Sequence, residues 1–305
     1  MKRTIGIIEL FITATIWGTA FVAQSVGMDH VGPFIFNATR YGIGAIVLIP
    51  VIFLLNKINK KDASTGEVNA SWDLKSTIVG GFFCGVVMAI ATLFQQFGIL
   101  YTTVGKAGFG TALYIIIVPF MGVLLKKRIT PNVWLAAVIA IIGFYLMCMS
   151  ETMSVNKGDV LVLIGAFFWS VHIHTVDHYV ARVNGVMMSS VQFAVSSVIC
   201  WILGFIFERF TFDDIVLAGG PILYAGLMSC GIAYTLQIIG QKNVEPALAC
   251  LIMSLESVVS AIAGWIILSE AMTAIEIFGA VMVFAGVIIA QLPSRSERSK
   301  VKAAS

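Results

Sequence analysis

Charge is scarce in this sequence. Only 11% of its 305 residues are Asp, Glu, Lys or Arg, whereas soluble domains average about 25%. Hydrophobic residues make up 59% of the chain, and the mean hydropathy is +0.96. Too few polar side chains remain to cover a soluble globule of this size. The net charge of +3 gives no electrostatic support for binding nucleic acid. The composition therefore predicts an integral membrane protein whose solvent is the lipid bilayer.

Motifs for catalysis and cofactor binding are also missing. The sequence has no HExxH or GxSxG motif, no acidic metal cluster and no P-loop. The five cysteines lie apart in apolar stretches, so we interpret them as packing residues. His174, Asp177 and His178 share a helical spacing, but no fourth metal ligand lies nearby. We therefore expect no enzyme activity, no cofactor, no metal and no use of ATP.

Long apolar runs dominate instead. A helix crosses the hydrocarbon layer with about 20 residues, and ten stretches meet this length. The first is too long for a signal peptide and no small-residue cleavage site follows it, so we expect an uncleaved helix. The predicted spans are 5–26, 34–55, 78–101, 107–125, 133–149, 159–180, 186–207, 216–239, 247–268 and 275–292.

The distribution of basic residues predicts the orientation of these spans. Fifteen lysines and arginines fall in segments on the side of the N-terminus, three fall in the opposite loops, and Arg40 lies within a span. Basic loops stay in the cytoplasm. We therefore expect a multi-pass protein of the cytoplasmic membrane with both termini in the cytoplasm. Residues 293–305 are basic and almost free of apolar residues, which predicts a disordered cytoplasmic tail.

The ten spans divide into two similar sets of five. A shift of 152 residues pairs Trp17 with Trp169, and a shift of 142 residues pairs Gln95 with Gln237. Because five is odd, the two copies must cross the membrane in opposite directions, as the inverted repeats of secondary transporters do. We predict an all-α membrane protein with ten transmembrane helices in two inverted repeats, at 1–150 and 157–292, with a binding site between them near the midplane.

Several short motifs carry a family resemblance. Trp17-Gly18-Thr19-Ala20-Phe21, Arg40-Tyr41, Gln95-Gln96-x-Gly98, Leu255-Glu256-Ser257-Val258-Val259 and the run from Gly264 to Thr273 resemble the EamA-type permeases of the drug/metabolite transporter superfamily. The resemblance implies a ten-helix carrier without an ATP site that moves small metabolites across the cytoplasmic membrane. Many such permeases export amino acids or toxic analogues. Ser257 departs from the family pattern, which often has proline there, and Lys127 stands where the first half might carry a glutamate like Glu270.

Two ionisable residues lie inside predicted spans. A charge at mid-bilayer costs at least about 2.5–3.5 kcal/mol, so such residues usually face the protein interior and mark function. Burial favours the neutral form of a carboxyl, which makes Glu256 a candidate for proton coupling; a buried structural carboxyl is the alternative. Arg40 either reaches the outer surface or faces a cavity and holds an anion, such as Glu256 or a substrate carboxylate.

Polar and aromatic residues on single helix faces complete the candidate site. His172 is a second candidate for proton coupling, and Pro119 is a candidate hinge in the fourth span. Helix packing is the alternative for the glutamines and tryptophans. The predicted substrate cavity comprises Trp17, Phe21, Gln24, Arg40, Gln95, Gln96, Trp169, His172, Gln237 and Glu256.

The favoured function is a secondary transporter that exports a small metabolite, such as an amino acid, by alternating access coupled to protons. A passive facilitator or channel has the same sequence features and stays open as an alternative. An intramembrane enzyme is disfavoured because it would need a concentrated catalytic set. Besides the bilayer and a small-molecule substrate, the sequence indicates no partner, and it leaves the oligomeric state open.

Overall fold

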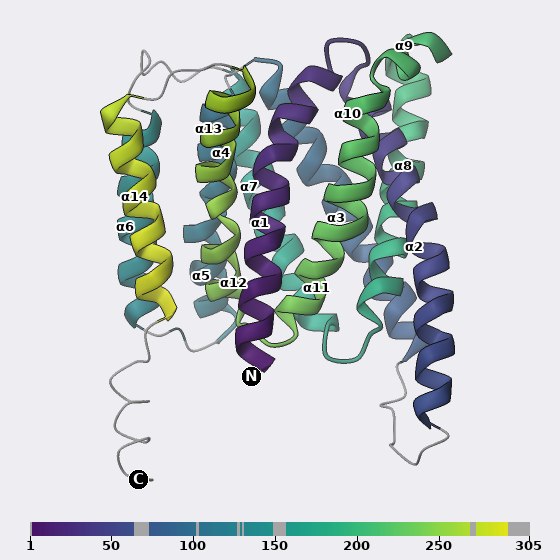
Figure 1. Ribbon diagram of the computed structural model, residues 1–305, viewed down its shortest axis with the longest axis horizontal. Helices are drawn as coiled ribbons and strands as arrows, with labels where there is room; N and C mark the ends of the chain where they lie inside the picture. The colour runs from purple at the N-terminus through teal and green to yellow at the C-terminus, as the bar shows by residue number, and fades with distance from the viewer. Residues whose placement is uncertain are drawn as a thin grey trace.

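The computed structural model describes residues 2–63, 73–101, 104–126, 129, 131–148, 157–268 and 273–291. Every regular element within these ranges is a helix. The helices stand side by side in an upright bundle, with the start of α1 and the end of α14 at the same lower edge (Figure 1). The basic tail at 293–305, Lys127 and Glu270 all lie outside the described residues.

The first repeat contains α1 Lys2–Gly27, α2 Pro33–Ala63, α3 Leu74–Ile99, α4 Val104–Ala112, α5 Tyr114–Leu124 and α6 Pro131–Cys148. The second contains α7 Lys157–Tyr179, α8 Gly185–Phe207, α9 Phe212–Leu217, α10 Gly219–Tyr224, the π-helix η1 Ala225–Tyr234, α11 Thr235–Gln241, α12 Pro246–Met253, α13 Leu255–Leu268 and α14 Ala274–Gln291.

The outer faces of the bundle suit lipid. Within the described part of the chain, seven helices are long and apolar enough to cross a membrane. The other three predicted spans contain the shorter apolar helices Gly110–Leu124, Pro131–Gly143 and Ile277–Gly286. Large apolar side chains such as Phe53, Phe205 and Ile266 are exposed on the surface, as expected where lipid replaces water. The predicted fold class, a multi-pass all-helical membrane protein, is confirmed.

Two spans that the sequence predicts as continuous are each interrupted at one residue, which keeps right-handed helical φ and ψ. The fourth span divides at Leu113 into α4 and α5, and the ninth divides at Ser254 into α12 and α13. At the second break, the Ser254 hydroxyl donates to the carbonyl of Leu251 at 2.7 Å, and this local bond competes with regular helix bonding. α4 and α13 occupy the upper half of the bundle, whereas α5 and α12 occupy the lower half (Figure 1), so both breaks lie at middle height.

The eighth span contains a second irregularity. Residues Ala225–Tyr234 form a π-helix between α10 and α11, where its equivalent α3 is a regular α-helix throughout. Hydrogen bonds from residue i to i+5 wind the chain more slowly than those of an α-helix. The side chains of α11, which follows the π-helix, therefore point in directions that differ from those expected for one continuous α-helix.

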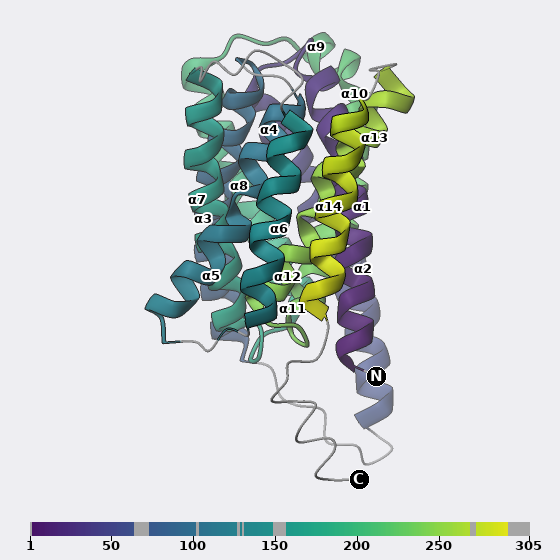
Figure 2. The same ribbon diagram turned by 90° about the vertical axis from the view of Figure 1, so that its left-hand side faces the viewer.

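Packing between the two halves follows a pseudo-twofold arrangement. α2 contacts its equivalent α8, and α6 contacts its equivalent α14. The equivalent fourth and ninth spans meet crosswise, because α5 contacts α12 and α4 contacts α13. α3 packs on α7, as η1 and α11 pack on α1. The α6–α14 pair stands at one end of the bundle in Figure 1, and this end faces the viewer in Figure 2. Because equivalent helices meet each other, residues at equivalent positions of the two repeats can meet near the axis.

Candidate functional site

A narrow cavity lies between the two repeats at the level of the helix breaks. Its volume is about 40 Å³, which is room for roughly three water molecules. The described residues that line it come from both halves of the chain: Trp17, Ala20, Phe21, Gln24, Arg40, Gln95, Thr111, Tyr114, Trp169, Ile173, Ser229, Tyr234, Gln237, Met253 and Glu256.

Eight of the ten residues predicted from the sequence lie around this cavity, and Gln96 and His172 do not. Gln96 is fully buried one position beyond Gln95, so its side chain leaves the same helix at a different angle. His172 is also fully buried, and its Nε2 donates to Oε1 of Gln192 at 3.1 Å. Pro119 is buried inside α5, below the cavity-lining residue Tyr114.

Tyr114 and Glu256 form the contact that joins the two broken spans. The phenol of Tyr114 donates to Oε1 of Glu256 at 3.1 Å. Tyr114 is the first residue of α5, and Glu256 lies in the first turn of α13. Both residues therefore lie directly beside the points where the two spans are interrupted.

Close backbone packing surrounds Glu256. A Cβ atom added at Gly18 in α1 would lie 2.6 Å from the carbonyl oxygen of Glu256 and 2.5 Å from Cβ of Val259. Only a glycine lets α1 approach α13 this closely. The α1 backbone therefore holds the first turn of α13 against the cavity.

Arg40 is buried, with 2% of its surface exposed, so it does not reach the outer surface. Its Nη2 donates to the hydroxyl of Tyr41 at 3.0 Å, and its guanidinium carbon lies 4.7 Å from the centre of the Tyr41 ring. Among the described residues that line the cavity, Arg40 carries the only cation and Glu256 the only carboxyl. Neither is ion-paired with the other; each is bonded to a tyrosine instead.

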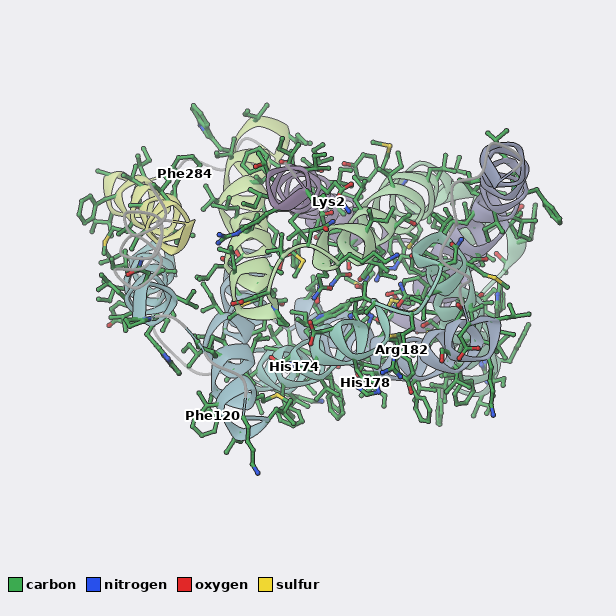
Figure 3. The ribbon with its side chains drawn as sticks, turned by 90° about the horizontal axis from the view of Figure 1, so that it is seen from below. Lys2, Phe120, His174, His178, Arg182 and Phe284 are labelled. Carbon is green, nitrogen blue, oxygen red and sulfur yellow. The ribbon has the colours of Figure 1, made fainter. Side chains whose placement is uncertain are left out.

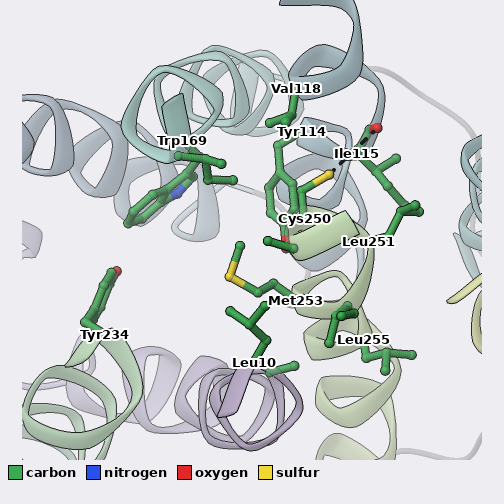
Figure 4. Close-up of a cluster of buried hydrophobic side chains, with 14 of the residues drawn as sticks. Leu10, Tyr114, Ile115, Val118, Trp169, Tyr234, Cys250, Leu251, Met253 and Leu255 are labelled. Carbon is green, nitrogen blue, oxygen red and sulfur yellow. Dashed lines mark hydrogen bonds between the residues drawn. The ribbon is translucent and has the colours of Figure 1, made fainter. Parts of the chain in front are cut away.

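Aromatic rings form the walls of the cavity. The Tyr234 ring centre lies 4.6 Å from that of Trp17 and 6.1 Å from that of Trp169. Tyr234 and Met253 project toward the space that Trp169 also borders (Figure 4). In the same view, Tyr114 lies beside Cys250, whose thiol donates to the carbonyl of Ile115 at 4.0 Å. That carbonyl is the one that Pro119 deprives of its helical partner.

Four polar residues of the cavity were not predicted from the sequence: Thr111, Tyr114, Ser229 and Tyr234. One signal was available for Tyr114. The shift of 142 residues that pairs Gln95 with Gln237 also pairs Tyr114 with Glu256. Tyr234 had no such signal, because its direction depends on the π-helix of which it is the last residue.

A wider vestibule of about 570 Å³ lies next to the cavity. It is lined by residues of α5, α7 and the connection between α11 and α12, including His174, Asp177, Lys242 and Glu245. His174 donates from Nε2 to the carbonyl of Val118 at 3.0 Å. α11 and α12, whose connection lines the vestibule, lie in the lower half of the bundle, where α1 begins (Figure 1), and Figure 3 views the molecule from that end. The vestibule therefore opens toward the end that carries the N-terminus.

Comparisons with known proteins agree with this architecture. Residues 4–149 and 156–291 each match the EamA-like transporter family. The chain is 28% identical over 294 residues to an uncharacterized transporter of Archaeoglobus fulgidus, covering 96% of this chain and 87% of that protein. It is 21% identical to the uncharacterized transporter YoaV of Bacillus subtilis, covering 95% and 96%. A solved crystal structure superposes with a TM-score of 0.74 at 18% identity, covering 95% of this chain and 97% of that one.

A helical membrane bundle built from two matched halves around a central polar cavity defines a multi-pass membrane transporter. The chain belongs to the EamA-like transporter family, because the family match spans both repeats and nearly its whole length.

Proposed function

We propose that the protein is a proton-coupled secondary transporter of the cytoplasmic membrane that exports a small metabolite, such as an amino acid or a related compound. The contact between Tyr114 and Glu256 carries this proposal. It places one carboxyl in a cavity between two repeats, at the breaks of two discontinuous helices. Discontinuous helices of this kind form substrate and ion sites in other secondary transporters.

Glu256 is suited to carry the proton. Only 4% of its surface is exposed, and Tyr114 supplies a hydrogen bond but no charge. A buried carboxylate without an ion-pair partner is costly, so a proton or a cationic group of the substrate must neutralise it. If the two compete for Glu256, release of one accompanies binding of the other, which is exchange of substrate for proton.

Arg40 complements Glu256 in the same cavity. A buried guanidinium with an aromatic neighbour and no carboxylate partner among the described residues attracts an anionic group. A substrate with both a carboxylate and an ammonium group could therefore bind Arg40 through the carboxylate and Glu256 through the ammonium group at the same time. The cavity is narrower than such a molecule, so binding requires the halves to move apart. The breaks at Leu113 and Ser254 and the proline at 119 supply points where the lining helices can bend.

Proton flux into proteoliposomes tests the proposal. Wild-type protein is reconstituted with an internal pH indicator and exposed to amino acids, organic acids, amines and sugars in turn. At least one compound should drive proton movement in the wild type. Glu256→Gln should abolish that movement yet still exchange labelled compound for unlabelled compound across the membrane. Asp213→Asn, which removes an exposed carboxyl in α9, is the matched control and should behave as wild type.

A passive facilitator would give a different result. Wild-type protein would then equilibrate the compound without proton movement, and Glu256→Gln would leave the flux unaltered. Substrate movement that ignores the pH gradient in every preparation would therefore exclude proton coupling.

A further inference from the structure

The cavity contains two equivalent tryptophan–glutamine pairs, and they differ in one hydrogen bond. Trp169 donates from Nε1 to Oε1 of Gln95 at 2.7 Å. The equivalent residues of the other pair are Trp17 and Gln237, which line the same cavity. The buried Nε1 atom of Trp17 and the buried Oε1 atom of Gln237 have no partner within the described part of the chain. Both atoms thus carry a desolvation penalty that a bound ligand can remove.

The difference between the pairs has a cause in the sequence. Gln95 follows Thr92 by three residues, and Thr92 is small and bonds to the carbonyl of Met88 at 2.8 Å. Gln237 follows Tyr234 by three residues, and the Tyr234 ring packs 4.6 Å from that of Trp17. Tyr234 also ends the π-helix, whose slower winding turns the following residues. Gln237 therefore does not take the orientation that Gln95 takes in the regular helix α3.

The chemistry of the two unpaired atoms defines a ligand. An indole N–H can only donate, and the amide oxygen of Gln237 can only accept. A hydroxyl or a primary carboxamide is a small uncharged group that can accept from one and donate to the other. A carboxylate has no proton to donate, and an ammonium group cannot accept. Water can fill this role, so a substrate that displaces it must make equivalent bonds or lose affinity.

We propose that Trp17 and Gln237 form a polar subsite that selects substrates carrying a hydroxyl or carboxamide group. This inference rests on the proposed transport function and adds a requirement to it. Arg40 and Glu256 would bind charged groups of the substrate, and the subsite between α1 and α11 would hydrogen-bond to an uncharged polar group. A cavity with buried hydrogen-bonding groups rejects analogues that lack the matching group, because those groups then stay unpaired.

Binding of matched compounds to the purified full-length protein tests the subsite. L-threonine and L-valine differ by a hydroxyl in place of a methyl group, and so do L-lactate and isobutyrate. In at least one pair, the hydroxylated compound should bind at least about tenfold more tightly. Trp17→Phe and Gln237→Leu should each reduce this ratio to less than about threefold. Gln96→Leu is the matched control, because Gln96 is buried but does not line the cavity; it should keep the ratio.

Every outcome of this experiment either supports or overturns the proposed subsite. Equal binding within both pairs, or no binding of any of the four compounds, overturns the subsite. A preference for the hydroxylated compound that survives both substitutions also overturns it. If one variant fails to fold, the wild-type ratio and the other variant still decide. Proton-coupled transport fails separately: no compound of the wide panel then drives proton flux, although the preference in binding persists.

Discussion

The phenol of Tyr114 donates a hydrogen bond to Oε1 of Glu256, and the two residues occupy equivalent positions of the two repeats. One repeat thus supplies the donor and the other the acceptor at the point where two broken helices face each other. Tyr41 and Phe193 are a second pair of equivalent residues that contact each other. The shift of 152 residues makes them equivalent, and their rings stack with centres 5.9 Å apart. The inverted repeat therefore brings equivalent positions together but gives them different chemistry.

Tyr114→Phe tests the importance of this contact. The substitution leaves a buried carboxyl oxygen without a donor, which should lower stability by about 1–3 kcal/mol. The melting temperature of the purified protein in detergent should fall accordingly. In a Glu256→Met background the acceptor is absent, so the same change at Tyr114 should lower the melting temperature much less. Equal losses in both backgrounds would mean that the hydroxyl acts through another neighbour.

Gly143 should be essential for the α6–α14 pair. A Cβ atom added there would lie 2.6 Å from the carbonyl oxygen of Gly279 and 2.9 Å from Cγ2 of Val283. Gly143→Ala should therefore push the two helices apart and lower the melting temperature, although alanine favours helix formation by about 1 kcal/mol over glycine. Gly219 in α10 is the control, because a Cβ atom there meets no atom within 4 Å. Gly219→Ala should be neutral or slightly stabilising, and matching losses at both sites would contradict the packing.

Acid should weaken the start of α3. Asp73 caps this helix, and hydrogen bonds from the side chain and backbone of Ser76 and from the backbone N–H of Lys75 hold the pKa of its carboxyl below the usual value. A lowered folded-state pKa contributes stability above the unfolded pKa of about 3.9, and that stability is lost as the pH falls through the folded value. The melting temperature of wild type should therefore approach that of Asp73→Asn as the pH drops below about 4. A pH-independent difference would show that titration of Asp73 contributes nothing.

Orientation in the membrane can be tested with reporter fusions. The excess of basic residues predicts that both termini lie in the cytoplasm. A reporter fused after His30, between α1 and α2, should be active outside the cell, and one fused after residue 305 should be active inside. In the structure, the first residue of α1 and the last of α14 lie at the same end of the bundle (Figure 1). Reporters active on the same side at both positions would rule out the predicted crossing of α1.

The apolar spans could be predicted because lipid imposes a local rule. Every crossing segment must be long and apolar and must satisfy its own backbone, so composition alone located α1, α2, α3, α7 and α8 within a few residues. Glu256 and Arg40 stood out for the same reason, since a charge is costly wherever it lies inside a span.

Which neighbours these residues meet was decided only by the tertiary structure. Gln95 and Gln96 are adjacent and chemically identical, yet only Gln95 lines the cavity, because the packing of α3 on α7 sets its rotation. The interruptions at Leu113 and Ser254 were not predicted from the sequence, although the Ser254 hydroxyl bonds locally to the carbonyl of Leu251. The inverted-repeat membrane protein with a buried acid and a buried base could be predicted from the sequence, because burial in lipid acts on each segment separately. Only the packing of the spans shows that Tyr114 bonds to Glu256, and that Nε1 of Trp17 and Oε1 of Gln237 have no partner among the described residues, because those distances depend on how all the spans pack at once.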